Sequence, residues 1–377
     1  MSIATTDLVG LKVHIVGAGV AGLSAAIALA QEGATVNVFE RAEVLEDVGA
    51  GLQLSPNALR ALDALEVEPR ATWFSDITLY DGLNDARLAR LPLRRANMPY
   101  AAAHRADLID ALYKRTVALS IPVTLGVESG DNPDADLVIG ADGVRSALRA
   151  SLTGSAPRFT GKMAWRALIA AKDIDPDWIE RGLQTFLGPK AHLVTYPLRE
   201  NSILNVVGIV DAEDGIEENW RQKGDVTLMR AGFAGWSKRV WSLMDPIDDL
   251  MMWGLFDHKP LPRWQDGRRV LVGDAAHPVV PFFAQGAAMA LEDAVVLANC
   301  LLRAPVDEAV QRFEFIRKPR TSSILRASWG NARLFHFESP VMRFGRIATM
   351  PILSRVAPSI FTKRYDWVYG YDPRMAH

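Results

Sequence analysis

The chain has 377 residues, of which 49% are hydrophobic, and this length predicts two domains or one large domain with an insertion. A formal net charge of −2 argues against nucleic acid or an anionic membrane surface as a partner. The single cysteine, Cys300, excludes a disulfide within the chain, which fits a reducing cytoplasm. Cys300 lies in an apolar helical pattern, so we expect it in the core.

The amino-terminal region predicts a strand, a tight turn, a helix and a second strand. Residues 11–16 have the pattern of a short buried strand, and a helix follows that Gly33 ends as a carboxyl-terminal cap. Residues 34–40 predict the second strand. This order is typical of the opening of a doubly wound parallel sheet.

The rest of the chain alternates between two kinds of structure. Residues 55–66, 104–119 and 134–149 add helices and a buried strand, whereas residues 73–93 predict a β-hairpin and residues 157–256 mostly strands. The predicted fold class is therefore α/β, with a Rossmann-like nucleotide-binding domain, an inserted β-sheet domain for the substrate and a helical carboxyl-terminal tail. The expected boundaries are 1–72, 96–156 and 263–330 for the nucleotide-binding domain, 73–95 (the hairpin) and 157–262 for the substrate domain, and 331–377 for the tail.

The first chemical motif is the glycine-rich stretch GAGVAG between the first strand and the first helix. Gly17 permits the tight turn, Gly19 lets the backbone approach a pyrophosphate, and Gly22 lets the helix pack closely on the strand. Glu40 ends the second strand, where a carboxylate can accept hydrogen bonds from a ribose. With these flanking elements the motif predicts a dinucleotide site, without distinguishing NAD from FAD.

Two further strands end in glycine and an acid. Asp142 lies in GADG after one apolar strand, and Asp274 lies in GDAAHP after another. Taken alone, the GADG stretch with Asp142 is more typical of an ordinary turn than of a ligand site. Because the carboxyl ends of parallel strands line one crevice, a single extended dinucleotide would contact all three strand ends.

Together, in this order, the three motifs resemble the fingerprints of the single-component flavoprotein aromatic hydroxylases, which are FAD-dependent, NAD(P)H-consuming monooxygenases. The resemblance extends over nearly the whole chain. Residues 48–65, 104–108, 164–168, 192–197, 260–264, 284–294 and 366–372 are most similar to the salicylate-hydroxylase-like branch, which includes hydroxylases of hydroxybenzoates and hydroxypyridine carboxylates. The resemblance implies FAD as cofactor, NADH or NADPH as co-substrate, O2, and a phenolic or hydroxy-heteroaromatic acid hydroxylated through a flavin C4a-hydroperoxide.

The resemblance also implies roles for residues along the cofactor. Arg105 and Asp274 would contact the pyrophosphate and ribityl region of FAD. Arg41 could reach the AMP phosphate, although a surface arginine is a serious alternative. The backbone at Gly286 and Ala287 opens a helix whose amino terminus would face the flavin N1–C2=O edge, where the helix dipole stabilises the negative charge of reduced flavin.

The loop before that helix would form part of the substrate pocket. Pro281, together with Pro278, would fix an extended loop against the isoalloxazine without adding an unsatisfied N–H to a dry pocket. Phe282 and Phe283 could form an apolar wall, and Gln285 would face the substrate. His277 follows Asp274 closely but leads into the proline loop, so we interpret it as structural.

His192 and Tyr196 are the candidates for activating the substrate phenol. Their even spacing in a predicted strand places both on one sheet face, and the resemblance places them beside the substrate hydroxyl. The alternative is a half-buried sheet face with a satisfied histidine and a packed tyrosine. Arg166 could bind a substrate carboxylate or brace the interface between the two domains.

One segment departs from the family pattern. Only 34 residues separate Arg105 from Gly140, where the family usually has a longer β-meander. The shortened segment 121–136 is expected to trim the edge of the cofactor domain and expose the adenine end of FAD.

Two alternative functions remain open. One is a monooxygenase of the same fold that acts on a urate-like, polyketide or quinone-precursor ring. The other is a flavin-binding NAD(P)H oxidase that no longer hydroxylates. The apolar and basic residues 334–361 keep membrane association open for a quinone hydroxylase, although a packed helical tail is the favoured interpretation.

The expected location is the cytoplasm. The chain starts without the basic region and apolar run of a secretion signal, and glycines interrupt the apolar residues 13–30. The seven histidines show no metal-ligand spacing, so no metal site is expected. We expect no nucleic-acid partner, no stable membrane insertion, and a monomer or homodimer.

Overall fold

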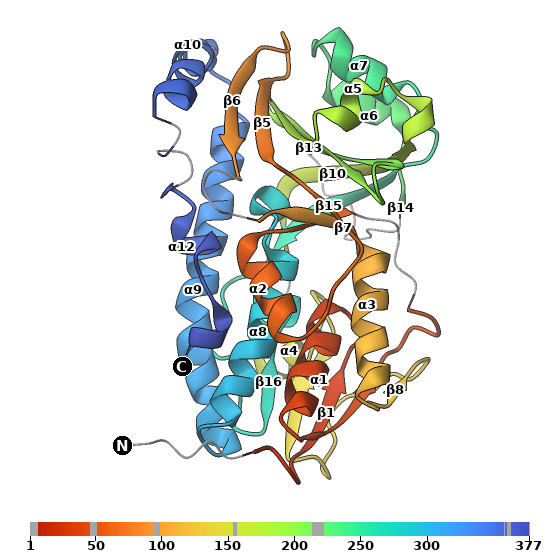
Figure 1. Ribbon diagram of the computed structural model, residues 1–377, viewed down its shortest axis with the longest axis vertical. Coiled ribbons are helices and arrows are strands. Elements are labelled where there is room, and N and C mark those ends of the chain that lie inside the picture. The colour runs from red at the N-terminus through yellow and green to blue at the C-terminus, as the bar shows by residue number, and fades with distance from the viewer. Residues whose placement is uncertain are drawn as a thin grey trace.

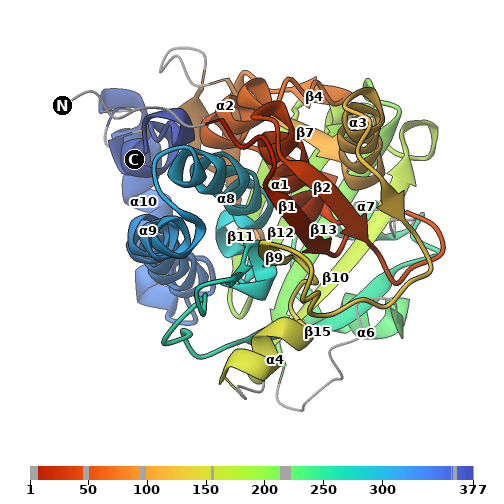
Figure 2. The ribbon, with the colours of Figure 1, turned by 90° about the horizontal axis from the view of Figure 1, so that it is seen from below.

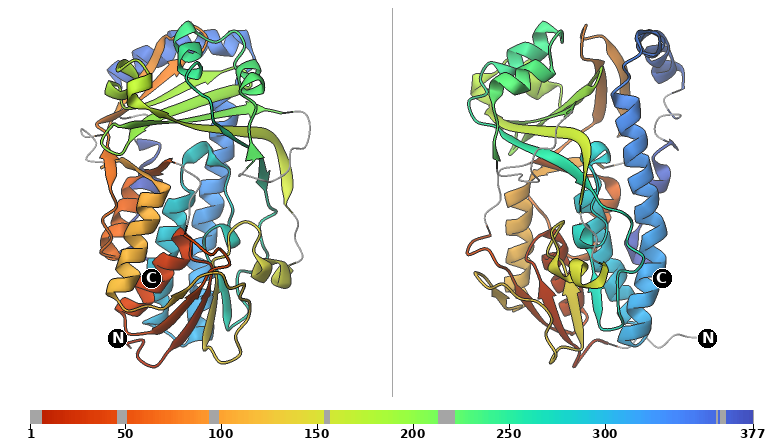
Figure 3. Two further views of the ribbon diagram at one scale, coloured as in Figure 1. Left: turned by 90° about the vertical axis from the view of Figure 1, so that its right-hand side faces the viewer. Right: turned by 180° about the vertical axis from the view of Figure 1, so that it is seen from behind.

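The computed structural model describes residues 7–45, 51–93, 99–153, 157–212, 222–357, 359 and 363–376. A parallel sheet lies at one end of the molecule and a large mixed sheet at the other (Figures 1 and 3). The predicted fold class is confirmed: a Rossmann-like region, a second sheet and carboxyl-terminal helices are all present. Among the described residues, no helix combines the length and the apolar character needed to cross a membrane.

The parallel sheet has five strands, and every pair of neighbours runs parallel. In spatial order the strands are β16 (Arg269–Leu271), β9 (Leu137–Gly140), β1 (Lys12–Val16), β2 (Thr35–Phe39) and β8 (Val123–Thr124). The accompanying helices are α1 (Val20–Gln31), α3 (Arg105–Ala118), α4 (Ala147–Thr153) and α8 (Gly286–Leu301). Helix α1 packs against both α3 and α8, and Figure 2 shows the three together beside the sheet. The two-residue strand β8 forms the edge at the shortened segment.

The apolar residues of β1 and α1 form one continuous core. Ile15 on β1 and Leu23, Ile27 and Leu29 on α1 are completely buried. They share this core with Cys300 on α8, which is 1% exposed. Burial of such branched side chains stabilises the fold by about 1.5–3 kcal/mol each. The core therefore fixes the strand ends that carry the chemical motifs.

The large sheet has eight strands, of which β5 and β11 pair in parallel while the other neighbours are antiparallel. In spatial order they are β14 (Gln222–Lys223), β15 (Met251–Asp257), β10 (Arg158–Ala170), β13 (Ile203–Asp211), β12 (Ala191–Leu198), β11 (Leu183–Gly188), β5 (Asp76–Asp81) and β6 (Arg87–Pro92). The hairpin β5–β6 thus joins the sheet of the inserted region through β11. Three short helices lie beside this sheet: α5 (Asp177–Glu180), α6 (Val226–Gly232) and α7 (Lys238–Met244).

The large sheet buries its two faces in different ways. Trp165, Phe186 and Phe233 form a core with residues of α6 and α7. Alternation along the strands directs Ala164 and Ile209 into another cluster, with Phe282. That second face is the one turned toward the cofactor region.

A small antiparallel sheet and the carboxyl-terminal helices connect the two regions. The small sheet has the order β3 (Gly51–Leu54), β7 (Ala101–His104) and β4 (Ala71–Trp73), with α2 (Pro56–Ala64) after β3, and its strands β4 and β7 contact β12. The late helices are α9 (Val306–Phe335), α10 (Pro340–Val356) and α12 (Asp366–Tyr369). Helix α9 runs along the side of the molecule past both sheets (Figure 1). Short 3-10 helices are η2 (Ala171–Asp173), η3 (Gly273–Ala275), η4 (Pro281–Phe283) and η5 (Pro373–Met375).

Candidate active site

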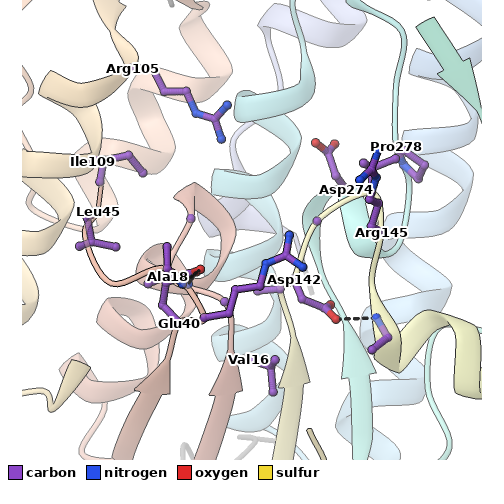
Figure 4. Close-up of a pocket in the computed structure, with 18 of the residues that line it drawn as sticks. Val16, Ala18, Glu40, Leu45, Arg105, Ile109, Asp142, Arg145, Asp274 and Pro278 are labelled. Carbon is purple, nitrogen blue, oxygen red and sulfur yellow. Dashed lines mark hydrogen bonds between the residues drawn. The ribbon is translucent and has the colours of Figure 1, made fainter. Parts of the chain in front are cut away.

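A cleft opens where the strands of the parallel sheet end (Figure 4). Its volume of about 870 Å³ lies within the range of sites for cofactors and small molecules. Residues from the four strand ends line one side: Gly17 and Gly19, Glu40 and Arg41, Asp142, and Asp274. Residues from the large sheet line the other side: Arg166, Met251 and Trp253. The cleft therefore brings the three sequence motifs together and places them opposite the inserted sheet.

Each glycine of the GAGVAG turn has a different steric surrounding. Gly17 has a φ of +103°, and a Cβ atom there would lie 2.5 Å from the carbonyl oxygen of Ala141. A Cβ atom on Gly22 would lie 1.8 Å from the carbonyl oxygen of Gly17. A Cβ atom on Gly19, by contrast, would meet no heavy atom within 4 Å. Gly17 and Gly22 are required by packing, whereas Gly19 leaves open space above the helix amino terminus, where a pyrophosphate can approach.

Two carboxylates beside the turn present acceptors to the cleft. The Glu40 carboxylate accepts hydrogen bonds from the backbone N–H groups of Ala18 at 2.8 Å and Ala42 at 3.0 Å. Asp142 accepts one from the N–H of Ala147 through Oδ2 at 2.8 Å, while its buried Oδ1 has no hydrogen-bond partner among the described residues. An unmatched buried acceptor is costly, so a ligand hydroxyl there would satisfy it. Carboxylate acceptors at these positions fit the hydroxyl groups of FAD rather than its pyrophosphate.

Asp274 and Arg105 approach the middle of the cleft from opposite sides (Figure 4). Arg105 is the first residue of α3, and Asp274 lies in η3 directly after the β16 strand. Limited solvation at the bottom of the cleft raises the pKa of Asp274, although His277, Arg105 and Arg149 oppose that shift. Arg105 and Arg149 are therefore close enough to Asp274 to oppose the effect of burial, without reversing it. Arg41 also lines the cleft, with an exposed side chain.

The loop before α8 only partly matches its expected roles. Pro281 lines the cleft, but Gly286 and Ala287, the first residues of α8, do not. Gln285 is 1% exposed, and its amide group is used inside the protein: Nε2 donates to Ser55 Oγ at 3.0 Å, and Oε1 accepts from Asn57 Nδ2 at 3.0 Å. The expectation that Gln285 faces the substrate therefore does not fit this geometry.

A buried charge cluster behind this loop was not anticipated from the sequence. Arg317 on α9 donates to Asp293 Oδ1 and to Glu292 Oε2 on α8, each at 2.7 Å, and all three side chains are fully buried. Arg320 adds two hydrogen bonds to Glu292. The sequence signal that could have revealed this cluster is the pair of adjacent acids, Glu292 and Asp293, in the otherwise apolar α8, since buried acids need partners. The cluster fixes α8 against α9.

The cluster also reaches the cofactor loop. Asp293 Oδ2 accepts hydrogen bonds from the backbone N–H of Gly273 at 2.8 Å and from His277 Nε2 at 2.6 Å. Burial raises the pKa of Asp293, but His277 and Arg317 outweigh it and hold that pKa below its ordinary value. This geometry fits the structural role expected for His277.

The inserted sheet directs its candidate residues toward the cofactor region. Strand register places Arg166 on β10 opposite Val207 on β13, and Val207 opposite Val194 on β12. His192 and Tyr196 flank Val194 at even spacing, so they share one face, as predicted, and this is also the face of Arg166. The Arg166 guanidinium lies 5.3 Å from the centre of the Trp253 ring and lines the cleft.

His192 and Tyr196 themselves do not line the cleft. His192 is 2% exposed and is surrounded by the rings of Phe282, Phe335 and His336. Burial raises the pKa of Tyr196 to about 12, with Arg166 opposing the shift, so its hydroxyl stays protonated at neutral pH. The ring centre of Phe282 lies 5.5 Å from that of His192.

Comparisons with known proteins identify the relatives of the chain. Residues 122–314 match the model of an FAD binding domain, and residues 15–46 match that of an NAD(P)-binding Rossmann-like domain. The chain is 34% identical to 3-amino-4-hydroxybenzoate 2-monooxygenase of Streptomyces platensis and 32% identical to 3-hydroxybenzoate 6-hydroxylase of Klebsiella oxytoca. These alignments cover 96% of the chain, and 96% and 97% of the relatives. A salicylate hydroxylase structure with bound substrate superposes with a TM-score of 0.76, at 25% identity over 96% of each chain.

The fold, the dinucleotide cleft and these matches define an FAD-dependent monooxygenase. More particularly, the chain belongs to the family of FAD-dependent aromatic hydroxylases that contains salicylate hydroxylase and the hydroxybenzoate hydroxylases. The resemblance seen in the sequence motifs and the expectation of FAD as cofactor are both confirmed. Among the described residues, no group of side chains could hold a metal ion.

Proposed function

We propose that the enzyme hydroxylates a phenolic or hydroxy-heteroaromatic acid and consumes one NADH or NADPH and one O2 per turnover. One oxygen atom enters the ring and the other leaves as water. The observation that carries this proposal is the course of the cleft, which runs from the GAGVAG turn to Arg166 and Trp253 on the inserted sheet. A cofactor held by the strand ends would then face a ring held by that sheet.

The strand-end residues are assigned to the cofactor. We assign the backbone of Gly17, Gly19 and Gly22 to the pyrophosphate, Glu40 to a ribose, and Arg105, Asp142 and Asp274 to the phosphate and ribityl region, with Arg41 toward the AMP end. The first turn of α8, at Gly286 and Ala287, is assigned to the flavin edge. When bound, FAD would supply the redox chemistry that uses NAD(P)H and O2.

The inserted sheet is assigned to the substrate. Arg166 supplies a fixed positive charge beside the aromatic surface of Trp253, a combination suited to an aromatic carboxylate. His192 is assigned as the acceptor of the substrate phenol proton and Tyr196 as a hydrogen-bond donor, because burial keeps its hydroxyl protonated. Pro281 closes the cleft as an apolar wall that keeps water from the reacting atoms.

The named activities of the relatives support an acid of the hydroxybenzoate type. The curated relatives include a 3-amino-4-hydroxybenzoate monooxygenase, a 3-hydroxybenzoate hydroxylase and a salicylate hydroxylase. A 6-hydroxynicotinate monooxygenase among them supports hydroxypyridine carboxylates as a second group to test. The single cysteine fits an enzyme that works in the reducing cytoplasm. The proposed oligomeric state is a monomer or a homodimer.

The test is a coupled assay with the FAD-loaded protein. Oxidation of NADH and of NADPH is followed across hydroxybenzoates, aminohydroxybenzoates and hydroxypyridine acids, with catalase controls and chromatographic product detection. The proposal predicts that at least one acid accelerates oxidation and yields a hydroxylated product in matching amount. Acceleration with H2O2 as the sole product for every acid would instead support a flavin-dependent oxidase.

A further inference from the structure

A chain of hydrogen bonds leads from buried His192 to the protein surface. The ring nitrogen Nδ1 of His192 lies 2.8 Å from Nε2 of His336, and Nδ1 of His336 lies 2.7 Å from Oδ1 of Asp211. Exposure increases along this path: His192 is 2% and His336 7% exposed as whole residues, and the side chain of Asp211 is 32% exposed. Lys162 donates to the same Oδ1 of Asp211.

The fold explains why these groups meet. Lys162 on β10 pairs with Asp211 on β13, and His192 on β12 pairs with Ile209 two residues earlier, so all three side chains share one face of the sheet. His336 approaches this face as the C-cap residue of α9. Three strands and one helix end therefore build the path.

The hydrogen bonds fix which ring nitrogens carry protons. Lys162 Nζ also lies 3.3 Å from Nδ1 of His336, but Lys162 already donates to Asp211, and the 2.7 Å contact of Nδ1 is with that carboxylate. An ionised Asp211 can only accept, so we place the proton of a neutral His336 on Nδ1, which donates to it. Nε2 of His336 is then an acceptor, and Nδ1 of His192 must donate to it. This leaves Nε2 of a neutral His192 without a proton, which is the form that can accept one from a phenol.

The local charges keep the path in this state at neutral pH. Burial alone raises the pKa of Asp211, but His336 and Lys162 outweigh it and hold that pKa below its ordinary value. Burial lowers the pKa of His336, and burial lowers that of His192 well below its ordinary value. Among the described residues, Lys162 and Asp211 are the charged groups facing the two rings, whose other neighbours, Phe282 and Phe335, are aromatic.

We infer that His192, His336 and Asp211 form a proton path that carries the substrate phenol proton to solvent, with His336 and Asp211 acting through His192. This inference rests on the proposed function. The phenol O–H bond breaks as an Nε2–H bond forms on His192, whose Nδ1 proton passes to Nε2 of His336. The Nδ1 proton of His336 passes to Asp211, which releases it to water.

Neither ring has to hold a stable positive charge in this sequence. A buried imidazolium at His192 is unfavourable, as the lowered pKa of that ring shows, so a base that passes its proton onward is better suited than one that keeps it. The transient charge falls instead on His336, at the carboxyl-terminal end of α9, where the helix dipole favours a cation. The path thereby joins an enclosed reaction site to the bulk solvent.

The test compares the FAD-loaded wild type with H336Q and D211N. In H336Q, the glutamine can keep hydrogen bonds at position 336 but cannot relay a proton. D211N changes a partly exposed residue, so this variant still tests the path if H336Q folds poorly. The matched control is D257N, which alters a carboxylate at the end of β15 that pairs with Arg158. Stopped-flow measurement with a pH-indicator dye follows proton release when the acid identified in the coupled assay binds to the oxidised enzyme.

We expect both variants to slow proton release and lower kcat by about tenfold or more, with KM changing by less than about twofold. We expect added imidazole to restore part of the rate, and D257N to behave as the wild type. Unchanged release rates and pH profiles in H336Q and D211N, or an equal loss in D257N, would overturn the proton path. If the wild type yields no hydroxylated product from any acid, the proposed function itself fails, and the path fails with it.

Discussion

His277 and Asp293 are joined by a 2.6 Å hydrogen bond between Nε2 and Oδ2, with both side chains buried. The same carboxylate oxygen accepts the backbone N–H of Gly273, one residue before Asp274, which lines the cleft. Position 274 therefore depends on α8, and through Arg317 on α9 as well. His277, within the third sequence motif, thus holds that motif in place.

Replacing Arg317 tests whether this cluster supports the site. In R317M, Glu292 and Asp293 lose the guanidinium that they share while remaining buried. Removing one partner of a buried ion pair costs roughly 3–5 kcal/mol, so we expect a loss of that size in the free energy of unfolding in urea. The control R158Q breaks an exposed pair and should cost about 1 kcal/mol or less. An R317M loss no larger than that of R158Q would contradict the structural role.

His258 predicts a specific pH dependence of stability. It is 8% exposed, and neither of its ring nitrogens has a hydrogen-bond partner among the described residues. Burial, assisted by Arg149, lowers the pKa of His258 from 6.5 to about 4. As pH falls below 6.5, His258 therefore becomes protonated in the unfolded chain but stays neutral in the folded chain. The folded state loses stability over this range, down to about pH 4.

The variant H258Q removes this contribution. Its unfolding free energy should fall less steeply between pH 6.5 and about 4 than that of the wild type, by up to about 1.4 kcal/mol per pH unit. Urea unfolding at several pH values measures both slopes, and the difference between them isolates His258 from the other histidines. Parallel curves for the two proteins would show that His258 titrates normally in the folded chain.

Substitutions of two glycines in the GAGVAG turn should affect different properties: G17A the stability of the apoprotein, and G19A the binding of FAD. G17A places a side chain at a φ of +103° and 2.5 Å from a backbone oxygen, so the apoprotein should lose on the order of 1–3 kcal/mol from strain alone. G19A meets open space and has an extended backbone at φ −78°, so its apoprotein should unfold like the wild type. G19A should nevertheless bind FAD about tenfold or more weakly, because the methyl group occupies the path of the pyrophosphate.

Flavin absorbance after dialysis and urea unfolding of the apoprotein separate these effects. Normal FAD retention by G19A would place the pyrophosphate away from this turn.

Substitutions of Arg166 test whether this residue binds the substrate carboxylate or braces the interface between the two regions. For an aromatic acid, R166Q should raise KM by roughly 10–100-fold, since hydrogen bonds to charged groups contribute about 1.5–3 kcal/mol. R166K should recover only part of this loss, because lysine lacks the planar fork. Steady-state kinetics with the acid and with its analogue lacking the carboxylate provide the comparison. If R166Q weakened both compounds equally and lowered the melting temperature, the brace would be the correct interpretation.

The cofactor side of the molecule was largely predictable from the sequence. Its signals are local: Gly17, Glu40, Asp142 and Asp274 each follow an apolar strand, and parallel strands bring their carboxyl ends to one edge by topology alone. The shared face of His192 and Tyr196 followed from strand periodicity in the same way.

The parts that sequence reasoning missed depend on long-range packing. Gln285 lies among residues that suggested a substrate contact, yet its partner Ser55 is 230 residues away in the chain. His336 meets His192 across 144 residues, because α9 runs past both sheets. No local pattern specifies either pair, since each depends on how helices seat against a sheet.

The most direct test of the central claim is the origin of the oxygen in the product. The FAD-loaded enzyme would turn over its aromatic acid with NADH or NADPH under oxygen-18 gas in ordinary water, and mass spectrometry would measure the product. A monooxygenase of this family must place one labelled oxygen atom in each molecule of hydroxylated acid. An unlabelled hydroxyl group, or labelled hydrogen peroxide with no hydroxylated acid, would contradict the account.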